Sequence, residues 1–311
     1  MNKDASKTRL SVVIPCYNSQ DWIGRAIQSA LDAGCDDLIL VVSDDGSTDG
    51  SAEAVRAFGD RVILLSGPNR GACHARNAGM EIAKAKGATH VLFLDADDYL
   101  EGDALAGAAE VAGRTGADII LSHNHIQFDD GRRLERRVYS GQVTPEDFFE
   151  GWMTGKHFAP VAVLLRIDFV EKMGGWDESL SRAQDTDLFL RMMFERPVIM
   201  MNDRGAAIYN MVNPGSVSRN VSPKSTEARI RVISRLLEKM KGTSFEPLMP
   251  LMLQRLYGVT RAAFQMKQTE LGRKGVKVMA AYGYRKHPGT RSHSLLSSLI
   301  GLEAKVRLWG N

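Results

Sequence analysis

The chain has 311 residues, of which 44% are hydrophobic and 25% charged, values typical of a globular protein with a sizeable core. No apolar run reaches the roughly 18–20 residues that a membrane-spanning helix needs, and the first seven residues contain no apolar signal-peptide segment. Cys16, Cys35 and Cys73 have no metal-ligand spacing. We therefore expect three reduced thiols and a cytoplasmic protein.

The net charge of +3 is the sum of two regions of opposite sign. Residues 1–221 carry 23 basic and 32 acidic side chains, a net charge of −9, whereas residues 222–311 carry 17 and 5, a net charge of +12. The basic region favours an anionic surface or partner. Two interpretations stay open: helices that pack on the body, or an amphipathic surface in peripheral contact with anionic lipid at the inner face of the cell membrane. Nucleic acid is not supported as a partner, because the body is acidic and no recognition motif is present.

The first hundred residues alternate short apolar runs with helical patterns. We expect strands at 10–14, 38–42, 62–65 and 91–94, and helices within 19–34, 51–58 and 71–87. This alternation predicts an α/β fold, with a mostly parallel central sheet and helices on both faces. The strand candidates are apolar throughout, as expected for strands buried on both sides.

Further along the chain the pattern is less regular. Residues 117–140 predict two strands with a turn at 129–131. Helical patterns follow near 145–153, 168–173 and 185–195, and from about residue 225 the chain is helical and basic. A boundary near 221–225 is therefore expected between the body and a helical C-terminal region.

Polar residues follow each of the first four strand candidates. They are Pro15-Cys16-Tyr17-Asn18, then Asp44 to Asp49, then Pro68 to Gly71 leading into His74 to Asn77, and finally Asp95 to Asp98. In an open parallel sheet, ligands bind outside the carboxyl ends of the strands. The sequence therefore predicts a ligand site along this edge.

The acidic group after the fourth strand predicts a metal and nucleotide site. We expect Asp97 to bind a divalent ion that bridges a diphosphate and Asp95 to bond a ribose hydroxyl. An alternative left open is that Asp97 or Asp98 caps a helix within 99–113. No glycine-rich phosphate loop is present, so Arg70 or Arg76 would supply part of the charge that neutralises the diphosphate.

Four segments in order resemble the family 2 glycosyltransferases with the GT-A (Rossmann-like) fold. They are "SVVIPCYNSQDWIGRAIQSAL", "VVSDDGSTDGS", "PNRGACHARNAGMEIAKAKGATHVLFLDADD" and "GGWDESLSRAQDTDLFLRM". The resemblance implies a catalytic domain over 1–221, with a nucleotide-sugar half at about 8–115, an acceptor half at about 116–221, and the helical region at 222–311 beyond it. It also implies a nucleotide-diphospho-sugar donor, Mn²⁺ or Mg²⁺ as cofactor and inversion at the anomeric carbon. A glycan or lipid-linked acceptor would suit a basic C-terminal region in contact with anionic lipid.

The resemblance also assigns roles to single residues. On the donor side, the nucleotide pocket would contain Pro15, Tyr17 and Asn18, and Asp44 or Asp45 would bond the base and ribose. Arg70, Gly71 and Arg76 would line this pocket. Asp95-Ala96-Asp97 matches the Asp-x-Asp motif, in which Asp97 would bind the metal, with Asp95 as an alternative further ligand. Those on the acceptor side are Gly175 and Trp176 at the donor–acceptor junction, Gln184, and Asp185 as the catalytic base. Asp185 is also well placed to cap the helix that follows it.

Two departures from the family pattern raise a rival interpretation. Gln184 stands where the family commonly has Glu, and Asn213 stands where a His often completes the metal site. Asn213 would offer a weaker oxygen ligand. The rival is a catalytically weak sugar-nucleotide-binding or scaffold protein. A phosphoacceptor domain would need an acidic pair after the first strand, and a sugar-1-phosphate nucleotidyltransferase would need a glycine-rich loop at the same place. The sequence has neither feature there.

Three histidines remain as weaker candidates. His123 and His125 would share one face of a strand. We favour the interpretation that they form part of a polar sheet face over the interpretation that they bind a metal. His157 lies in "GKHFAPVAVLLR" and could line the acceptor site or pack in the core.

Overall fold

The computed structural model describes residues 8–135, 139–156, 158–212, 222–284 and 303–304. In this part of the chain one ten-stranded sheet runs in the order β3-β2-β1-β4-β9-β6-β10-β5, and β7 and β8 pair with β6 and β10. The strands are β1 (Leu10–Cys16), β2 (Ile39–Asp44), β3 (Ile63–Ser66), β4 (His90–Phe93), β5 (Tyr99–Glu101), β6 (Ile119–Gln127), β7 (Arg133–Leu134), β8 (Gln142–Val143), β9 (Val163–Arg166) and β10 (Ile199–Asn210).

The first four strands confirm the expectation of a parallel sheet. β1 lies between β2 and β4, with Val13 opposite Val41 on one side and Phe93 on the other. All of β1 except Pro15 is buried, and so is all of β2, which means that both faces of this half are covered. The carboxyl ends of β1, β2 and β4 consequently lie next to one another.

The second half of the sheet is mixed. β9 runs antiparallel to both β4 and β6, and β5 antiparallel to β10, whereas β6 and β10 are parallel. The helix expected within 99–113 begins only at Ala104, because residues 99–101 pair with β10 as a strand. Asp103 occupies its N-cap position. The interpretation of Asp97 or Asp98 as a helix cap is therefore wrong.

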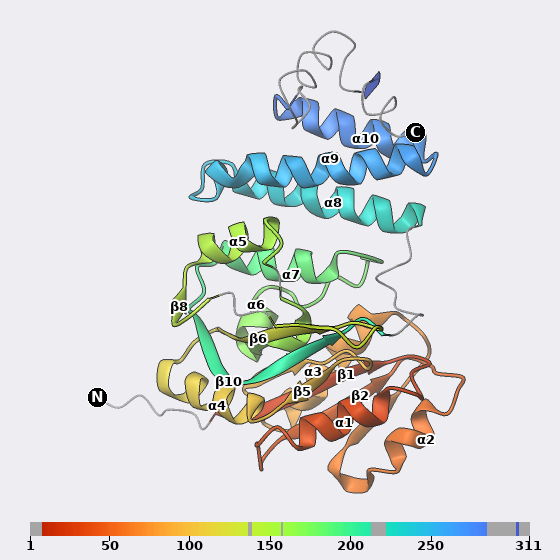
Figure 1. The fold of residues 1–311 in the computed structure, drawn as a ribbon, viewed down its shortest axis with the longest axis vertical. Helices are drawn as coiled ribbons and strands as arrows, with labels where there is room; N and C mark the ends of the chain where they lie inside the picture. The colour runs from red at the N-terminus through yellow and green to blue at the C-terminus, as the bar shows by residue number, and fades with distance from the viewer. Residues whose placement is uncertain (1–7, 136–138, 157, 213–221, 285–302, 305–311) are drawn as a thin grey trace.

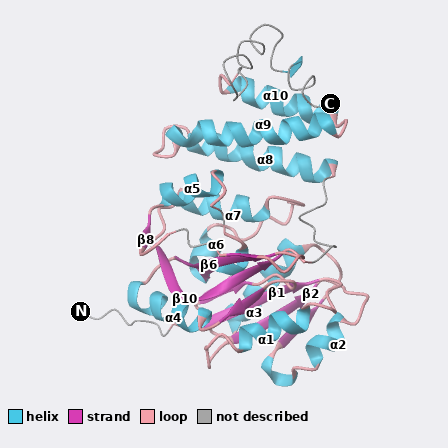
Figure 2. Cartoon of the chain, in the orientation of Figure 1, coloured by secondary structure: helices cyan, strands magenta, loops and turns pink. Residues whose placement is uncertain are grey.

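Helices cover the sheet and extend away from it in layers (Figures 1 and 2). α3 packs on β1 and β2, and α4 on β6 and β10, while α5 and α7 lie between the sheet and the stacked helices α8, α9 and α10. The helices are α1 (Ile23–Leu31), α2 (Ser51–Arg56), α3 (Ala72–Ala85), α4 (Ala104–Thr115), α5 (Pro145–Met153), α6 (Ile167–Lys172), α7 (Gln184–Met193), α8 (Pro223–Met240), α9 (Met249–Gln265) and α10 (Thr269–Ala281).

Two serine side chains cap the start of α8. In α8 the Ser222 side chain accepts a hydrogen bond from the Ser225 amide and the Ser225 side chain accepts one from the Ser222 amide, with Pro223 at the first helical position. Such a capping box satisfies two backbone donors that the helix leaves open. None of the helices in the described ranges is long and apolar enough to cross a membrane.

Candidate active site

The loops that follow β1 and β2 are tied together at the edge of the sheet. The side-chain oxygen Oδ1 of Asn18 accepts a hydrogen bond from the backbone amide of Thr48 at 2.8 Å. The backbone amide of Asn18 donates to Ser47 Oγ at 3.0 Å. Asn18 has a φ of +48°, a conformation that Asn tolerates better than most residues. Tyr17 is half exposed beside it. Asn18 thus fixes the loop on which Tyr17 is presented to solvent.

The two aspartates after β2 bond to backbone amides. The Asp45 carboxylate accepts hydrogen bonds from the amides of Arg70 and Gly71 at 2.7 and 2.8 Å, and Asp44 accepts one from the Ser47 amide at 3.1 Å. Both carboxylates are buried. Asp45 therefore holds the loop before α3 against the end of β2. Both of its carboxylate oxygens accept these bonds, whereas Asp44 uses only one of its two oxygens in them.

Asp95 is bonded to a buried arginine. Arg76 Nη2 donates to Asp95 Oδ1 at 2.6 Å and Nη1 to Gln184 Oε1 at 3.2 Å, and the guanidinium stacks 4.6 Å from the centre of the Trp176 ring. Burial lowers the pKa of Arg76, but Asp95 outweighs this effect and the net pKa shift is upward. Arg76 therefore stays charged and connects the end of β4 to the start of α7.

Asp97 and Asp98 lie in different surroundings. Arg25 and Asn210 both donate to the backbone carbonyl of Asp97, at 3.0 and 2.9 Å, and the Asp97 side chain is half-buried. Asp98 is fully buried, and one of its carboxylate oxygens accepts a hydrogen bond from the Asn210 amide at 2.8 Å. Burial, with Asp95 and Asp97 nearby, raises the pKa of Asp98 well above its usual value.

The residues at this edge fit a divalent cation bound together with a diphosphate. The second carboxylate oxygen of Asp98 is buried without a hydrogen-bond partner among the described residues, and the repulsion between Asp98 and its acidic neighbours marks a local excess of negative charge. No three His, Cys, Asp or Glu side chains in the described ranges form a complete metal cage. Mg²⁺ usually takes only one or two carboxylates and completes its shell with phosphates and water.

Asp185 lies in the first turn of α7, one residue after Gln184. The N-cap position is Ala183, with a φ of +57°, so the interpretation of Asp185 as the N-cap is wrong. Its Oδ1 accepts a hydrogen bond from the Thr186 amide at 2.7 Å, as acids in a first helical turn often do. Asp185 contributes to the electrostatic environment of Arg76, which places it beside the group formed by Asp95, Arg76 and Gln184.

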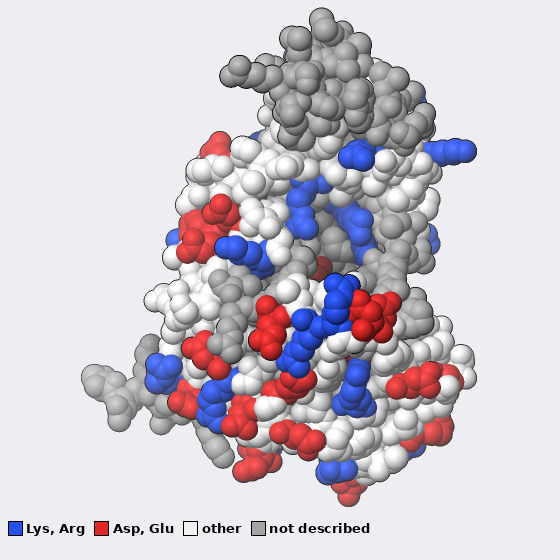
Figure 3. Space-filling model, in the orientation of Figure 1, with Lys and Arg blue, Asp and Glu red and all other residues white. Residues whose placement is uncertain are grey.

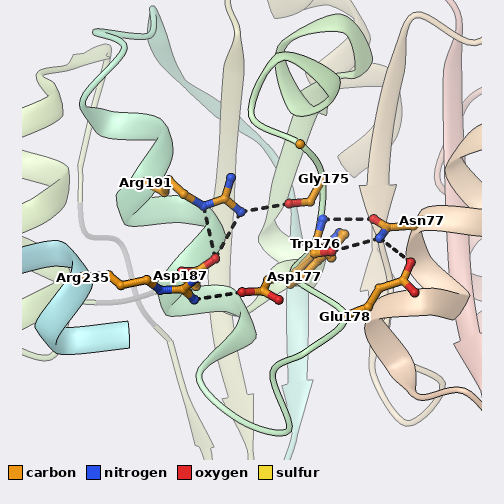
Figure 4. Close-up of a pocket in the computed structure, with 9 residues that line it drawn as sticks. Asn77, Gly175, Trp176, Asp177, Glu178, Asp187, Arg191 and Arg235 are labelled. Carbon is orange, nitrogen blue, oxygen red and sulfur yellow. Dashed lines mark hydrogen bonds and ion pairs between the residues drawn. The ribbon is translucent and has the colours of Figure 1, made fainter. Parts of the chain in front are cut away.

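A pocket of about 490 Å³ lies behind the Gly175-Trp176 turn (Figure 4). Asp187 pairs there with Arg191 and with Arg235 of α8, at 3.1 and 3.2 Å, and Arg191 also donates to the Gly175 carbonyl at 2.9 Å. The Trp176 side chain itself is buried. Internal ion pairs line this pocket, so we interpret it as support for the Gly175-Trp176 turn.

Glu178 connects this turn to the donor-side loop. Its carboxylate accepts a hydrogen bond from Asn77 at 3.0 Å and lies 3.2 Å from His74 Nδ1 and 3.8 Å from Arg70. The Asn77 hydrogen bond and the two basic neighbours lower the pKa of Glu178. Arg70 is consequently held by its backbone to Asp45 and by its side chain to Glu178.

Several sequence candidates lie elsewhere. The rings of His123 and His125 stack at 6.5 Å on β6, and His123 faces Asp203 at 3.6 Å, which confirms the shared strand face. Asn213 and His157 lie outside the described residues. All three cysteines are free thiols, as expected.

Three residues of the site were not identified from the sequence. Arg25 and Asn210 fix the Asp97 backbone, and Glu178 joins the two halves. Arg25 lies in an amphipathic helix whose polar face gave no separate signal, and Asn210 lies 113 residues from Asp97. Only the sheet brings these partners together.

Known proteins share both sequence and fold with this chain. Residues 11–174 match the profile described as "Glycosyl transferase family 2". The chain is 30% identical to a chondroitin synthase of Pasteurella multocida (strain Pm70) over 188 residues, which cover 59% of this chain and 18% of that protein. It is 29% identical to the succinoglycan biosynthesis protein ExoO of Rhizobium meliloti (strain 1021) over 244 residues, 74% of this chain and 68% of that protein. The match thus spans about a fifth of the length of the Pasteurella synthase.

Solved structures show the same fold at low identity. TarS 1–349 of S. aureus, in complex with UDP-GlcNAc, superposes with a TM-score of 0.67 at 20% identity over 88% of this chain and 80% of that chain. The mannosyltransferase PcManGT of Pyrobaculum calidifontis, in complex with GDP-Man and Mn²⁺, gives a TM-score of 0.53 at 18% identity over 97% and 83%.

Proposed function

Because the chain belongs to glycosyl transferase family 2, we propose that it transfers a sugar from a nucleotide-diphospho-sugar to a hydroxyl group, with inversion at the anomeric carbon. The observation that carries this proposal is the series of contacts from Asp95 through Arg76 to Gln184, which ends beside Asp185. It joins the strand end that would bind the donor to the helix that would carry the base. We assign the catalytic part to residues 1–221.

In this proposal Asp185 is the general base. The acceptor oxygen attacks the anomeric carbon while the bond from that carbon to the diphosphate breaks, and Asp185 takes the proton of the hydroxyl group. Base and leaving group lie on opposite sides of the sugar, so the displacement is single and the configuration inverts. Gln184 bonds to Arg76 and to the Leu180 carbonyl, which fixes the start of α7 and so the position of Asp185.

The donor would lie across the carboxyl ends of β1, β2 and β4. Tyr17 and the free oxygen of Asp44 would contact the nucleoside, and Asp95 the ribose. Asp97 would hold a divalent ion on the diphosphate, with Asn213 as a further ligand; when bound, Mn²⁺ or Mg²⁺ would stabilise the charge that develops on the leaving group. A UDP-sugar is the first choice, since TarS is described with UDP-GlcNAc, and GDP-Man in the mannosyltransferase is the alternative.

The product would belong to a polysaccharide or glycolipid. This part of the proposal is supported by relatives that are named as chondroitin synthase and as a succinoglycan biosynthesis protein. A location at the cytoplasmic side of the cell membrane would suit a lipid-linked acceptor.

The test measures donor binding and donor turnover separately. We expect one of UDP, GDP, CMP and dTDP to raise the melting temperature, more with Mn²⁺ than with EDTA. Asp185→Asn should keep this shift and lose about 10²–10⁴-fold in transfer, the usual contribution of a general base. Asp60→Asn, an exposed aspartate in the 3₁₀ turn before β3, is the matched control.

Two results would refute parts of the proposal. If a nucleotide binds but no donor is turned over with any acceptor, the catalytically weak binding protein is the better description. If none of the four nucleotides shifts the melting temperature, the donor site itself is wrongly assigned.

A further inference from the structure

The turn from Asp95 to Asp98, which we call the Asp97 turn, is held by two elements from distant parts of the chain. The Asp98 amide donates to the Asp95 carbonyl at 2.9 Å and closes the turn. Arg25 of α1 donates from Nη2 to the Asp97 carbonyl at 3.0 Å, and Asn210 of β10 donates from Nδ2 to the same oxygen at 2.9 Å. Helix α1 and strand β10 therefore meet on one atom of the turn.

Asn210 holds the Asp97 turn at a second point. Its backbone amide donates to Asp98 Oδ1 at 2.8 Å, and both residues are buried. Asn210 is the last residue of β10, where it lies opposite Gln127 of β6 in the sheet. The two bonds to the turn thus come from a residue whose backbone is fixed by strand pairing.

Arg25 is fixed by two aromatic rings. Its guanidinium lies 4.3 Å from the centre of the Tyr99 ring and 5.6 Å from that of Trp22, within the roughly 6 Å over which an aromatic ring attracts a cation. Ser29, one turn further along α1, accepts a hydrogen bond from the Leu100 amide at 3.1 Å. Helix α1 therefore holds both the Asp97 turn and the strand that follows it.

These contacts determine which group of Asp97 can face a ligand. A carbonyl oxygen has two lone pairs, and in Asp97 it accepts one bond from Arg25 and one from Asn210. The carbonyl oxygen is thus used within the protein, and the peptide group is fixed from two sides. The carboxylate is then the group of Asp97 that would hold a metal.

We propose that Arg25 and Asn210 are positioning residues for the metal ion. They hold the backbone of Asp97 so that its carboxylate is presented to Mn²⁺ or Mg²⁺ on the diphosphate, and neither side chain needs to touch the ion. This inference rests on the proposed function. It makes the metal affinity depend on α1 and β10, two elements outside the Asp-x-Asp motif.

The test measures the metal-dependent and the metal-independent part of nucleotide binding separately. Calorimetric titration gives the Mn²⁺ concentration that produces half of the effect of Mn²⁺ on UDP binding, and a titration in EDTA gives the affinity for UDP alone. GDP replaces UDP if only GDP raises the melting temperature. A merely structural role would change both quantities, whereas a positioning role changes the first.

Arg25→Met separates positioning from general electrostatics. Figure 3 shows basic side chains among acidic ones on this face of the body, so the two effects must be distinguished by sign. The variant removes the donor to Asp97 and a positive charge near the acidic turn, and the lost charge alone would tighten the binding of a cation. We expect instead that the half-saturating Mn²⁺ concentration rises about tenfold, since partners that orient a metal ligand commonly change metal affinity by 10–100-fold.

Two further variants complete the set. Asn210→Leu leaves the charge unchanged and removes the side-chain bond to Asp97, while Asn210 Oδ1 has no hydrogen-bond partner to lose among the described residues. It should raise the half-saturating Mn²⁺ concentration in the same direction. Arg56→Met is the matched control, because Arg56 is an exposed arginine of α2 that pairs with Glu53 of the same helix, and it should change neither quantity.

The proposal is overturned if Arg25→Met leaves the half-saturating Mn²⁺ concentration unchanged or lowers it, or if UDP affinity in EDTA falls by the same factor. Arg25 is exposed, so this variant decides the question even if Asn210→Leu does not fold. A wild-type protein that binds UDP with Mn²⁺ but transfers no sugar would refute the proposed function and leave this inference in place. A wild-type protein whose UDP binding ignores Mn²⁺ would overturn both.

Discussion

Arg76 is the residue on which the two halves of the candidate site depend. Its guanidinium bonds to Asp95 and Gln184 and stacks on Trp176, and its side chain is only 8% exposed. A planar group with several donors can make these contacts at once, whereas an ammonium group cannot. The arginine is therefore required for its shape as well as for its charge.

We predict that Arg76→Lys lowers both stability and donor affinity. Loss of the Gln184 bond and of the stacking should cost about 1–3 kcal/mol in the free energy of unfolding, and the loosened Asp95 should weaken nucleotide binding. Urea unfolding and a nucleotide titration measure the two effects. Arg114→Lys, at an exposed position of α4, is the control, and equal stability of the two variants would contradict the prediction.

His90 provides a prediction about pH. Burial, with Arg166 nearby, lowers the pKa of His90 below its usual 6.5. The folded protein thus holds His90 neutral, while the unfolded chain takes up a proton below about pH 6.5, so His90 lowers stability as the pH falls and has no effect above that range. The loss between pH 7.5 and 5.5 is at most about 1.4 kcal/mol for this group.

Urea unfolding at these two pH values tests the role of His90. His90→Gln, which cannot take up the proton, should lose less stability on acidification than the wild type. An identical loss in both proteins would assign the pH dependence to other groups, such as His125, whose pKa is also lowered by burial.

At the scale of elements, the contact between α3 and β1 depends on a glycine. A Cβ atom at Gly79 would lie 2.4 Å from Cγ1 of Val13, a buried residue of β1. Gly79→Ala should therefore destabilise the fold by about 1–3 kcal/mol, more than the roughly 1 kcal/mol that alanine adds to a helix. Thermal or urea unfolding measures the change.

Gly24→Ala is the matched control in α1. No atom lies within 4 Å of the position of its Cβ, so the same substitution should stabilise the protein by up to about 1 kcal/mol. If both variants shift the free energy of unfolding in the same direction, packing against Val13 does not explain why position 79 requires glycine.

The sequence predicts the first four strands well, because each is a short apolar run followed by polar residues. It does not predict β10, in which Asn202, Asp203 and Arg204 interrupt the pattern and the register with β6 shifts. The three residues of β5 form a strand only through their partner β10. Edges and bulges of this kind are set by tertiary pairing and not by local preference.

The candidate site was predictable to a similar extent. The positions of Asp44, Asp45, Asp95 and Asp97 at strand ends follow from the order of strands and loops. Their partners do not, since the Arg25 side chain meets the Asp97 carbonyl across 72 residues and Arg76 meets Gln184 across 108.

At the scale of the whole molecule, α8 and α9 pack on the body and do not form a separate arm. Their apolar residues, among them Ile230, Leu237 and Leu256, are buried, which supports the interpretation of the basic region as packed helices. Contact with anionic lipid stays a prediction. Polar bonds from α8 and α9 to the body accompany this packing, at Asp177, Asp187 and Trp152.

We therefore predict that the sheet and the C-terminal helices unfold together. Arg235 bonds to Asp177 at 2.9 Å and to the nearly buried Asp187 at 3.2 Å, so Arg235→Ala should lower the free energy of unfolding by about 1–3 kcal/mol, because it deprives a buried carboxylate of one partner. In calorimetry the single transition should move to lower temperature as a whole.

Lys277→Ala, at an exposed position of α10, should leave that transition in place. The prediction is contradicted if Arg235→Ala splits the calorimetric transition in two, with one component at the wild-type temperature and the other at a lower temperature. The C-terminal helices would then unfold independently of the sheet, and the bonds from Arg235 to Asp177 and Asp187 would not couple the two parts. Cooperative unfolding is thus the measurable consequence of the ion pairs between α8 and the body.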